Sequence, residues 1–152
     1  MNPFLADYKT RLQQWRVLRD QIKQEPDLNA KIDKCLAFWK QAPEESMRLN
    51  WDDATDWPGA WDLLNDNSYC PSCHSLGIAY TLMLADPDTF PNVQLKLIWD
   101  IQNSVQRIVA HTHTYYLNWG YVDKTHVDRL KHVIIQNTWE WHNKQWQATR
   151  PK

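Results

Sequence analysis

The hydrophobic period changes once along the chain, and this change constrains the fold more than any other feature of the sequence. Before residue 92 the apolar side chains recur in steps of three and four, the spacing of one face of an α-helix. After residue 92 they alternate with polar side chains, the spacing of a half-buried β-strand. The sequence therefore predicts an α+β fold, with helices first and an antiparallel sheet in the C-terminal half.

Two helices are expected in the region 1–43. One apolar stripe runs through residues 4–24, and a second runs through residues 28–39. Pro26 ends the first helix, and Asp27 can cap the N-terminus of the second because its carboxylate accepts from free backbone N–H groups. The pattern predicts a helical hairpin that packs against the rest of the domain.

The region 44–90 is expected to hold an acidic loop and a central helix. Residues 44–57 are acidic and weakly periodic, which indicates a short helix and a loop. Residues 72–85 carry the most apolar stripe of the chain and predict a buried central helix. Ser72 is the expected N-cap, and the helix is expected to end near Asp86.

Three or four strands are expected after the central helix. Residues 93–101 alternate clearly, and residues 105–117 form a longer run rich in Thr, Val and Tyr. A tight loop follows in which Gly120 can take a positive φ, and residues 121–123 begin a third strand. Residues 133–141 alternate again, so they predict a fourth strand, with a helix as the competing interpretation.

The length and the charge of the chain set its general class. With 152 residues the chain fits one domain, 1–152, whose sheet region spans 91–145. A net charge of −1 argues against a binder of nucleic acid and against a polybasic membrane-surface protein. We expect no membrane span and no secretory signal, and an odd count of three cysteines argues against a disulfide framework. The cytoplasm is the expected compartment.

Ten tryptophans are unusual for a chain of this length. Tryptophan is large and amphipathic, so an aromatic core with a few exposed rings or a surface built for contact both account for it. We therefore expect a protein partner or a protein substrate, and a homo-oligomer or a larger assembly fits the same composition.

Two cysteines and two histidines are the candidate chemical groups. Cys70 and Cys73, followed by His74, match the C-x-x-C-H pattern of c-type haem attachment, but haem c is not expected in a chain without an export signal. Zinc is a second interpretation, with Cys70, Cys73, His111 and His113 as a tetrahedral ligand set. Otherwise no cofactor is expected.

A thiol nucleophile is the third interpretation. Cys73 lies at the start of the central helix, where the helix dipole favours a thiolate. His113 or His111 would take the thiol proton, and Asp123 would orient the imidazole. With a loop at residues 118–120, His113 lies diagonal to Asp123 at about 7–8 Å. In the competing interpretation the cysteines are small buried hydrophobes and the histidines are structural.

These residues resemble those of the transglutaminase-like cysteine-enzyme superfamily. The resemblance covers residues 70–125 and is carried by Cys73, by the segment 111–117 and by the segment 119–125. It implies a cysteine nucleophile, a histidine base and an aspartate that orients it, in acyl transfer or amide hydrolysis. Members of such folds also persist without their chemistry.

A second resemblance concerns the whole chain. The segments 57–64 and 76–82 are similar to small proteins of tailed phages related to the T4 group, which implies a viral origin and no particular activity. In that case the compartment is the host cytoplasm or the virion. The alternative function is then a non-enzymatic interaction or assembly component with a tryptophan-rich contact surface.

Overall fold

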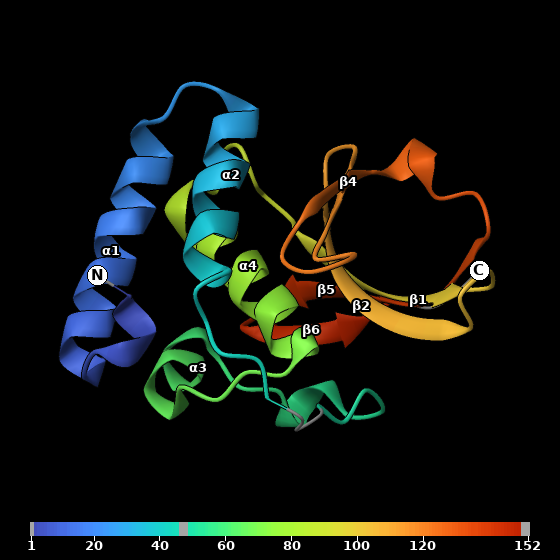
Figure 1. Ribbon diagram of the computed structural model, residues 1–152, viewed down its shortest axis with the longest axis horizontal. Coiled ribbons are helices and arrows are strands. Elements are labelled where there is room, and N and C mark those ends of the chain that lie inside the picture. The colour runs from blue at the N-terminus through green and yellow to red at the C-terminus, as the bar shows by residue number, and fades with distance from the viewer. Residues whose placement is uncertain (1, 46–48, 150–152) are drawn as a thin grey trace.

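The computed structural model describes residues 2–45 and 49–149. The helices are α1 (Tyr8–Gln24), α2 (Leu28–Trp39), α3 (Ala60–Asp66) and α4 (Pro71–Ala85). The strands are β1 (Gln94–Asp100), β2 (Val105–Thr112), β3 (Tyr115–Leu117), β4 (Lys124–His126), β5 (Val133–His142) and β6 (Gln145–Ala148). The α+β class with helices before the sheet is confirmed, as Figure 1 shows.

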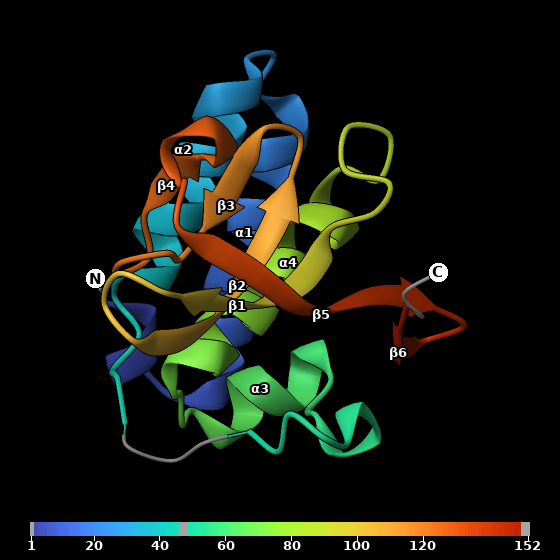
Figure 2. The same cartoon turned by 90° about the vertical axis from the view of Figure 1, so that its right-hand side faces the viewer.

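The strands form one antiparallel sheet of six strands in the order β4-β3-β2-β1-β5-β6. We expected three or four strands, and the two beyond four are the short strands β3 and β6. In Figure 2 the sheet faces the viewer, and α1, α2 and α4 lie behind it. The helical layer therefore covers one face of the sheet.

Aspartate caps begin both helices of the N-terminal hairpin. The Asp27 side chain accepts from the backbone N–H of Ala30 at 2.9 Å, which confirms the expected cap of α2. The Asp7 side chain accepts from the N–H of Thr10 at 2.9 Å, so α1 begins at Tyr8 rather than at residue 4. These bonds satisfy N–H groups that have no partner within a helix.

One hydroxyl joins the hairpin to the central helix. Thr81 of α4 is fully buried, and its Oγ1 accepts from the indole N–H of Trp15 and of Trp39, both at 2.9 Å. The same hydroxyl donates to the carbonyl oxygen of Gly77 at 2.6 Å. A Cβ at Gly77 would lie 2.5 Å from ring carbons of Trp39, so only glycine leaves room for that ring. Three helices meet around a single oxygen.

The central helix α4 packs on β2, and its N-cap lies two residues earlier than expected. The Ser75 hydroxyl donates to the carbonyl oxygen of Ile108 at 2.7 Å, which sets the level at which α4 lies on β2. Cys70 is the N-cap, and Pro71 takes the first helical position. Ser72 is therefore inside the helix and is not its cap. Proline favours this first position because its missing N–H has no role there.

The two faces of the sheet have separate apolar clusters. Ile108 and Ala110 of β2 belong to the main core beneath α4. Val109 lies between them in sequence but belongs to a second cluster with Ile98 and Tyr116. Successive side chains of a strand point to opposite faces, so the odd-numbered residues of β2 point away from α4.

The expected long strand over residues 105–117 is wrong in one respect. The chain turns at His113, whose φ is 53°, and this turn divides the run into β2 and β3. No described glycine has a positive φ, and Asn118 and Val122 take that conformation in the following loop in place of Gly120. The third strand of the expected pattern begins at Lys124.

Residues 133–142 form the strand β5, so the helical alternative for this segment is wrong. Part of the short helix expected within residues 44–57 falls on residues 46–48, which lie outside the described residues. In the described part of that segment there is one 3-10 turn, Ala54–Asp56. Across the described residues, every helix is too short or too polar to cross a membrane.

Candidate thiol site

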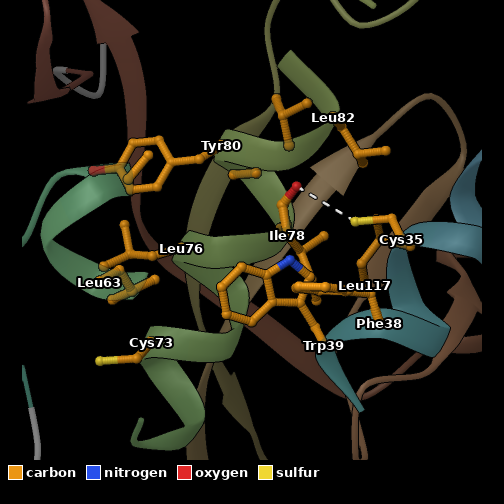
Figure 3. Packing of buried hydrophobic residues seen from close by; sticks show 14 of the residues in the cluster. Cys35, Phe38, Trp39, Leu63, Cys73, Leu76, Ile78, Tyr80, Leu82 and Leu117 are labelled. Atoms are coloured by element: carbon orange, nitrogen blue, oxygen red, sulfur yellow. Dashed lines mark hydrogen bonds between the residues drawn. The ribbon is translucent and has the colours of Figure 1, made fainter. Parts of the chain in front are cut away.

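Two cysteines share the first turn of α4. Cys70 is the N-cap and Cys73 lies one turn further on, so their side chains share one side of the helix end. The two sulfur atoms are 3.3 Å apart, within hydrogen-bond distance of each other. Figure 3 shows the sulfur of Cys73 directed away from the ring of Trp39. The structure therefore joins the two cysteines that the sequence placed in one motif.

Cys35 lies elsewhere, on α2. Its sulfur contacts the carbonyl oxygen of Ile78 at 3.8 Å, which Figure 3 marks with a dashed line. Its side chain is fully buried, and burial raises the pKa of the thiol far above its usual range. Cys35 is a structural residue of the core.

The hydrogen bond between the two sulfur atoms shifts the pKa values of Cys70 and Cys73 in opposite directions. The pKa of Cys70 is lowered to about 6, mainly by its hydrogen bond with the Cys73 side chain. The backbone N–H groups of Cys73, Leu49 and Ser72 lower this pKa further. Burial acts in the opposite direction on Cys70. The pKa of Cys73 is raised, first because its proton is held in that bond and then by burial. The shared hydrogen bond therefore favours negative charge on Cys70 and the proton on Cys73.

The pair lies between two cavities. A cavity of about 330 Å³ is lined by Cys70 together with Trp51, Gln106 and Asn118. A second cavity of about 310 Å³, lined by Trp57 and Leu63 among others, reaches Cys73. The two cysteines are themselves only 0% and 1% exposed. Small molecules that enter these cavities are the natural reagents for such thiols, because a folded protein surface does not reach them.

Polar side chains from two other parts of the chain hold the first turn of α4 in place. Asn118 donates through Nδ2 to the carbonyl oxygen of Pro71 and to Ser75 Oγ, both at 2.9 Å. The indole N–H of Trp51 donates to Ser72 Oγ at 3.1 Å. The side chains bonded to this turn are therefore an amide and an indole, neither of which is a base at neutral pH.

Two of these contacts could not be predicted from the sequence. Asn118 was interpreted only as a turn residue, because Asn-Trp-Gly between two alternating runs favours a loop. Trp51 lies in a segment without clear periodicity, and nothing in its neighbourhood marks it. Cys70 as a helix cap could have been foreseen, since proline directly after it favours the first helical position.

His111 lies on the far face of the sheet from the cysteines. It is an odd-numbered residue of β2 and pairs with Tyr116, a member of the second cluster, with the two ring centroids 5.0 Å apart. Burial, and then the charge of Lys96, lower the pKa of His111. The sheet itself separates this imidazole from the sulfur of Cys73.

His113 lies in the turn after β2, toward the other end of α4. Its ring packs edge-on against Phe90, which follows the C-terminus of α4, with centroids 5.7 Å apart. Its Nδ1 is bonded to Thr112 Oγ1 at 2.9 Å. The five residues from Ile108 to His113 span roughly 16 Å of strand. The structure thus does not bring His113 to the cysteines, and the expected meeting of sulfur and imidazole does not occur.

Asp123 lies in the loop that Asn118 holds beside α4, but its carboxylate forms a hydrogen bond within that loop. Its Oδ1 accepts from the backbone N–H of Gly120 at 2.8 Å. In the register of β3 and β4, Tyr115 pairs with His126, so the expected pairing of Tyr115 with Asp123 is wrong. The expected diagonal contact between His113 and Asp123 is lost with it.

The four expected zinc ligands do not gather. Among the described residues there is no group of three or more His, Cys, Asp and Glu side chains able to hold a metal ion. His74, the histidine of the haem pattern, has Nδ1 at 3.0 Å from the carbonyl oxygen of Cys70 and Nε2 at 3.3 Å from that of Ala42. Both ring nitrogens have backbone neighbours, so this imidazole is not directed at a ligand.

No family model matches the chain, and no curated protein sequence matches it. Solved structures do. Calcium-bound LapG of Legionella pneumophila aligns over 97% of this chain and 83% of its own, with 14% identity and a TM-score of 0.69. EGTA-treated LapG aligns over 91% of this chain and 79% of its own, with 14% identity and a TM-score of 0.67. A further LapG structure aligns over 92% of this chain and 80% of its own, with 13% identity and a TM-score of 0.66.

These similarities concern the fold, because the sequence identity is low. None of the LapG structures bears on the resemblance to phage proteins, which stays an expectation. The chain shares the fold of LapG over most of its length, and the transglutaminase-like interpretation of residues 70–125 stays an expectation.

Proposed function

We propose that this chain is a transglutaminase-like thiol protein in which Cys70 takes up acyl groups from small activated donors such as thioesters. The observation that carries the proposal is the position of the Cys70 sulfur, which lies at the N-cap of α4, 3.3 Å from the sulfur of Cys73, in a residue that lines a cavity of about 330 Å³. This hydrogen-bonded position lowers the pKa of the Cys70 thiol. A thiolate at a helix N-terminus is the reactive form of cysteine.

The chemistry follows from the groups around Cys70. The thiolate attacks the acyl carbon, a carbon–sulfur bond forms, and the bond to the leaving thiolate or phenolate breaks. The backbone N–H groups of Ser72 and Cys73 belong to the first turn of α4, where such groups lack helical partners. They are placed to stabilise the negative oxygen of the tetrahedral intermediate.

Unactivated amides are poor substrates for this arrangement. An amine leaves only with a proton, which an imidazole normally supplies. Among the described residues no hydrogen bond joins an imidazole nitrogen to either sulfur: His74 Nδ1 contacts the carbonyl oxygen of Cys70, and His111 and His113 lie elsewhere. We therefore propose a degenerate site that retains the nucleophile without the base.

With p-nitrophenyl acetate at pH 7, we expect a burst of one p-nitrophenolate per chain followed by slow turnover. The thiolate is acylated readily, while release of the acetyl group needs a water molecule that no base activates. Stopped-flow absorbance measures the burst, and mass spectrometry locates the acetyl group on Cys70. Cys70→Ser should lose the burst, and Cys35→Ser, which changes a core thiol away from the site, should keep it. A full burst in Cys70→Ser would contradict the proposal.

A second candidate function is protein binding, and one cavity favours it. An apolar cavity of about 560 Å³ lies among α3, α4 and β5 and is lined by Trp61, Tyr80, Leu84 and Trp141 among others. Trp61 is 51% exposed and Leu84 is 43% exposed. Lys144 is the charged side chain among the described lining residues. This composition suits an apolar peptide segment that carries a carboxylate.

Panning a random peptide library against the immobilised chain tests this second function. We expect enriched peptides with a leucine or aromatic residue near an acidic one, and Trp61→Ala should weaken their binding by about tenfold or more, as loss of a buried anchor does. Leu5→Ala is the matched control, because Leu5 is 85% exposed and lies outside this cavity. Equal binding by both variants, or no enriched sequence, would exclude the cavity as a peptide site.

A further inference from the structure

Cys70 and Cys73 have the geometry of a redox pair as well as that of a nucleophile with its hydrogen-bond donor. We infer that they form a reversible dithiol–disulfide couple, in which Cys70 attacks a low-molecular-weight disulfide and Cys73 resolves the mixed disulfide. The inference uses the same thiolate as the proposed acyl chemistry but requires no acyl donor.

The sulfur positions support direct bond formation. The two Sγ atoms are 3.3 Å apart, whereas a disulfide bond is about 2.05 Å long, so the atoms need to approach by only about 1.2 Å. The N-cap residue and the third residue of a helix lie on the same side, and their spacing suits the Cα separation that disulfides require. Small side-chain rotations therefore suffice, with α4 left intact.

The reaction balances with a disulfide, RSSR, as the oxidant. The Cys70 thiolate attacks one sulfur of RSSR, and RS⁻ leaves as the mixed disulfide forms. Cys73 then attacks the Cys70 sulfur, its proton passes to a thiolate, and the second RS group leaves. The sum converts one RSSR and the protein pair of one thiolate and one thiol into RS⁻, RSH and the Cys70–Cys73 disulfide.

The pKa of Cys73 changes in the direction that these two reaction steps require. While Cys70 is a thiolate, its charge and hydrogen bond raise the pKa of Cys73 and keep that thiol unreactive. Once Cys70 is part of a mixed disulfide, its negative charge is gone and this cause of the raised pKa disappears. Cys73 then becomes the better nucleophile at the moment when it is needed.

The surroundings select small partners. Cys70 is reached through the cavity lined by Trp51 and Asn118, and the residue has no exposed surface of its own. A tripeptide-sized disulfide fits this description better than a structural disulfide in a folded protein. Oxidation would also remove the thiolate that the acyl chemistry uses, so the couple would switch that chemistry off.

Incubation of the purified chain with mixtures of reduced and oxidised glutathione tests the couple. After acid quenching, alkylation and mass spectrometry, we expect the oxidised chain to lose two of its three alkylatable thiols, without bound glutathione and with Cys35 still free. Dithiothreitol should restore all three. The midpoint should be independent of protein concentration, because the disulfide is internal to one chain.

Three variants assign the roles. Cys73→Ser should stop at a glutathione adduct on Cys70, since no resolving thiol remains. Cys70→Ser keeps a good N-cap side chain and should slow thiol loss at pH 7 by more than about tenfold, because the thiolate is gone. Cys35→Ser should behave as the wild type does.

Other results overturn the inference. A wild-type chain that keeps all three thiols, or one that accumulates a stable glutathione adduct, has no resolving cysteine. A Cys73→Ser chain without an adduct has no nucleophile at Cys70. Since the experiment contains no ester, its failure leaves the acyl burst unaffected, and failure of the burst leaves this experiment unaffected.

Discussion

Replacing Cys73 with alanine is expected to raise the pKa of Cys70 from about 6 toward the usual thiol value of about 8.5. The S–H of Cys73 is the largest cause of the low value, and alanine has no donor to replace it. The backbone N–H groups of the first turn remain, so the new value stays below that of a free thiol. Absorbance of the thiolate at 240 nm across pH measures the shift directly.

Alkylation by iodoacetamide gives a second measure. At pH 6 a shift of two pKa units lowers the thiolate fraction of Cys70 roughly fiftyfold, but the less acidic thiolate is intrinsically more nucleophilic by several-fold. The rate at pH 6 should therefore fall by up to about tenfold and recover above pH 8. The sign follows from the deleted donor, which stabilised the charged form.

Cys73→Ser is the matched control for this experiment. Serine offers an O–H at nearly the same place and should keep most of the shift, whereas alanine should not. If the two variants titrate alike, with Cys70 unchanged in both, the hydrogen bond between the sulfurs does not set the acidity of Cys70. Burial raises the pKa of Cys35, so this thiol should not react with iodoacetamide in any of these proteins. Its lack of reaction checks that the core remains folded.

Thr81→Val is expected to lower the free energy of unfolding by about 3 kcal/mol. Valine fills nearly the same volume but removes the oxygen that accepts from Trp15 and Trp39, so two buried indole N–H groups lose their acceptor. Each such group costs about 1–3 kcal/mol. For a chain of this size the change corresponds to a fall in Tm of roughly 6–12 °C. Urea denaturation followed by tryptophan fluorescence measures it.

Thr81→Ser separates the hydroxyl from the methyl group. Serine keeps the acceptor and loses one buried methyl group, which costs about 1 kcal/mol. Valine should therefore be clearly more destabilising than serine. Equal losses in the two variants would mean that the packing of the methyl group, and not the shared oxygen, joins α1 and α2 to α4.

The helices were accessible from the sequence because their signals are local. The apolar steps of three and four and the carboxylate of Asp27 act within a few residues, so α1 and α2 follow from them almost directly. The strand over residues 133–142 was found in the same way, through alternation. The turn at His113 was not, because a positive φ at a histidine leaves no mark on the hydrophobic pattern.

The site depended on information that is not local. The contact of Ser75 with Ile108 sets the level of α4 on β2, and no sequence pattern encodes that level. Side chains of β2 alternate between the two faces of the sheet, so the face on which His111 lies depends on which face Ile108 occupies. A one-residue change of register moves every side chain of a strand to the other face. The motif of Cys70 and Cys73 survived because both cysteines belong to one helical turn.

The strand order has a consequence for the nascent chain. The central strand β1 pairs on one side with β2, which follows it at once, and on the other side with β5, some forty residues later in the sequence. During synthesis one edge of β1, with Leu95, Leu97 and Trp99, therefore stays open until β5 has left the ribosome. An open apolar edge readily pairs with another chain. Crowded polysomes are thus where this protein is most exposed to aggregation, and truncation before β5 would make that exposure permanent.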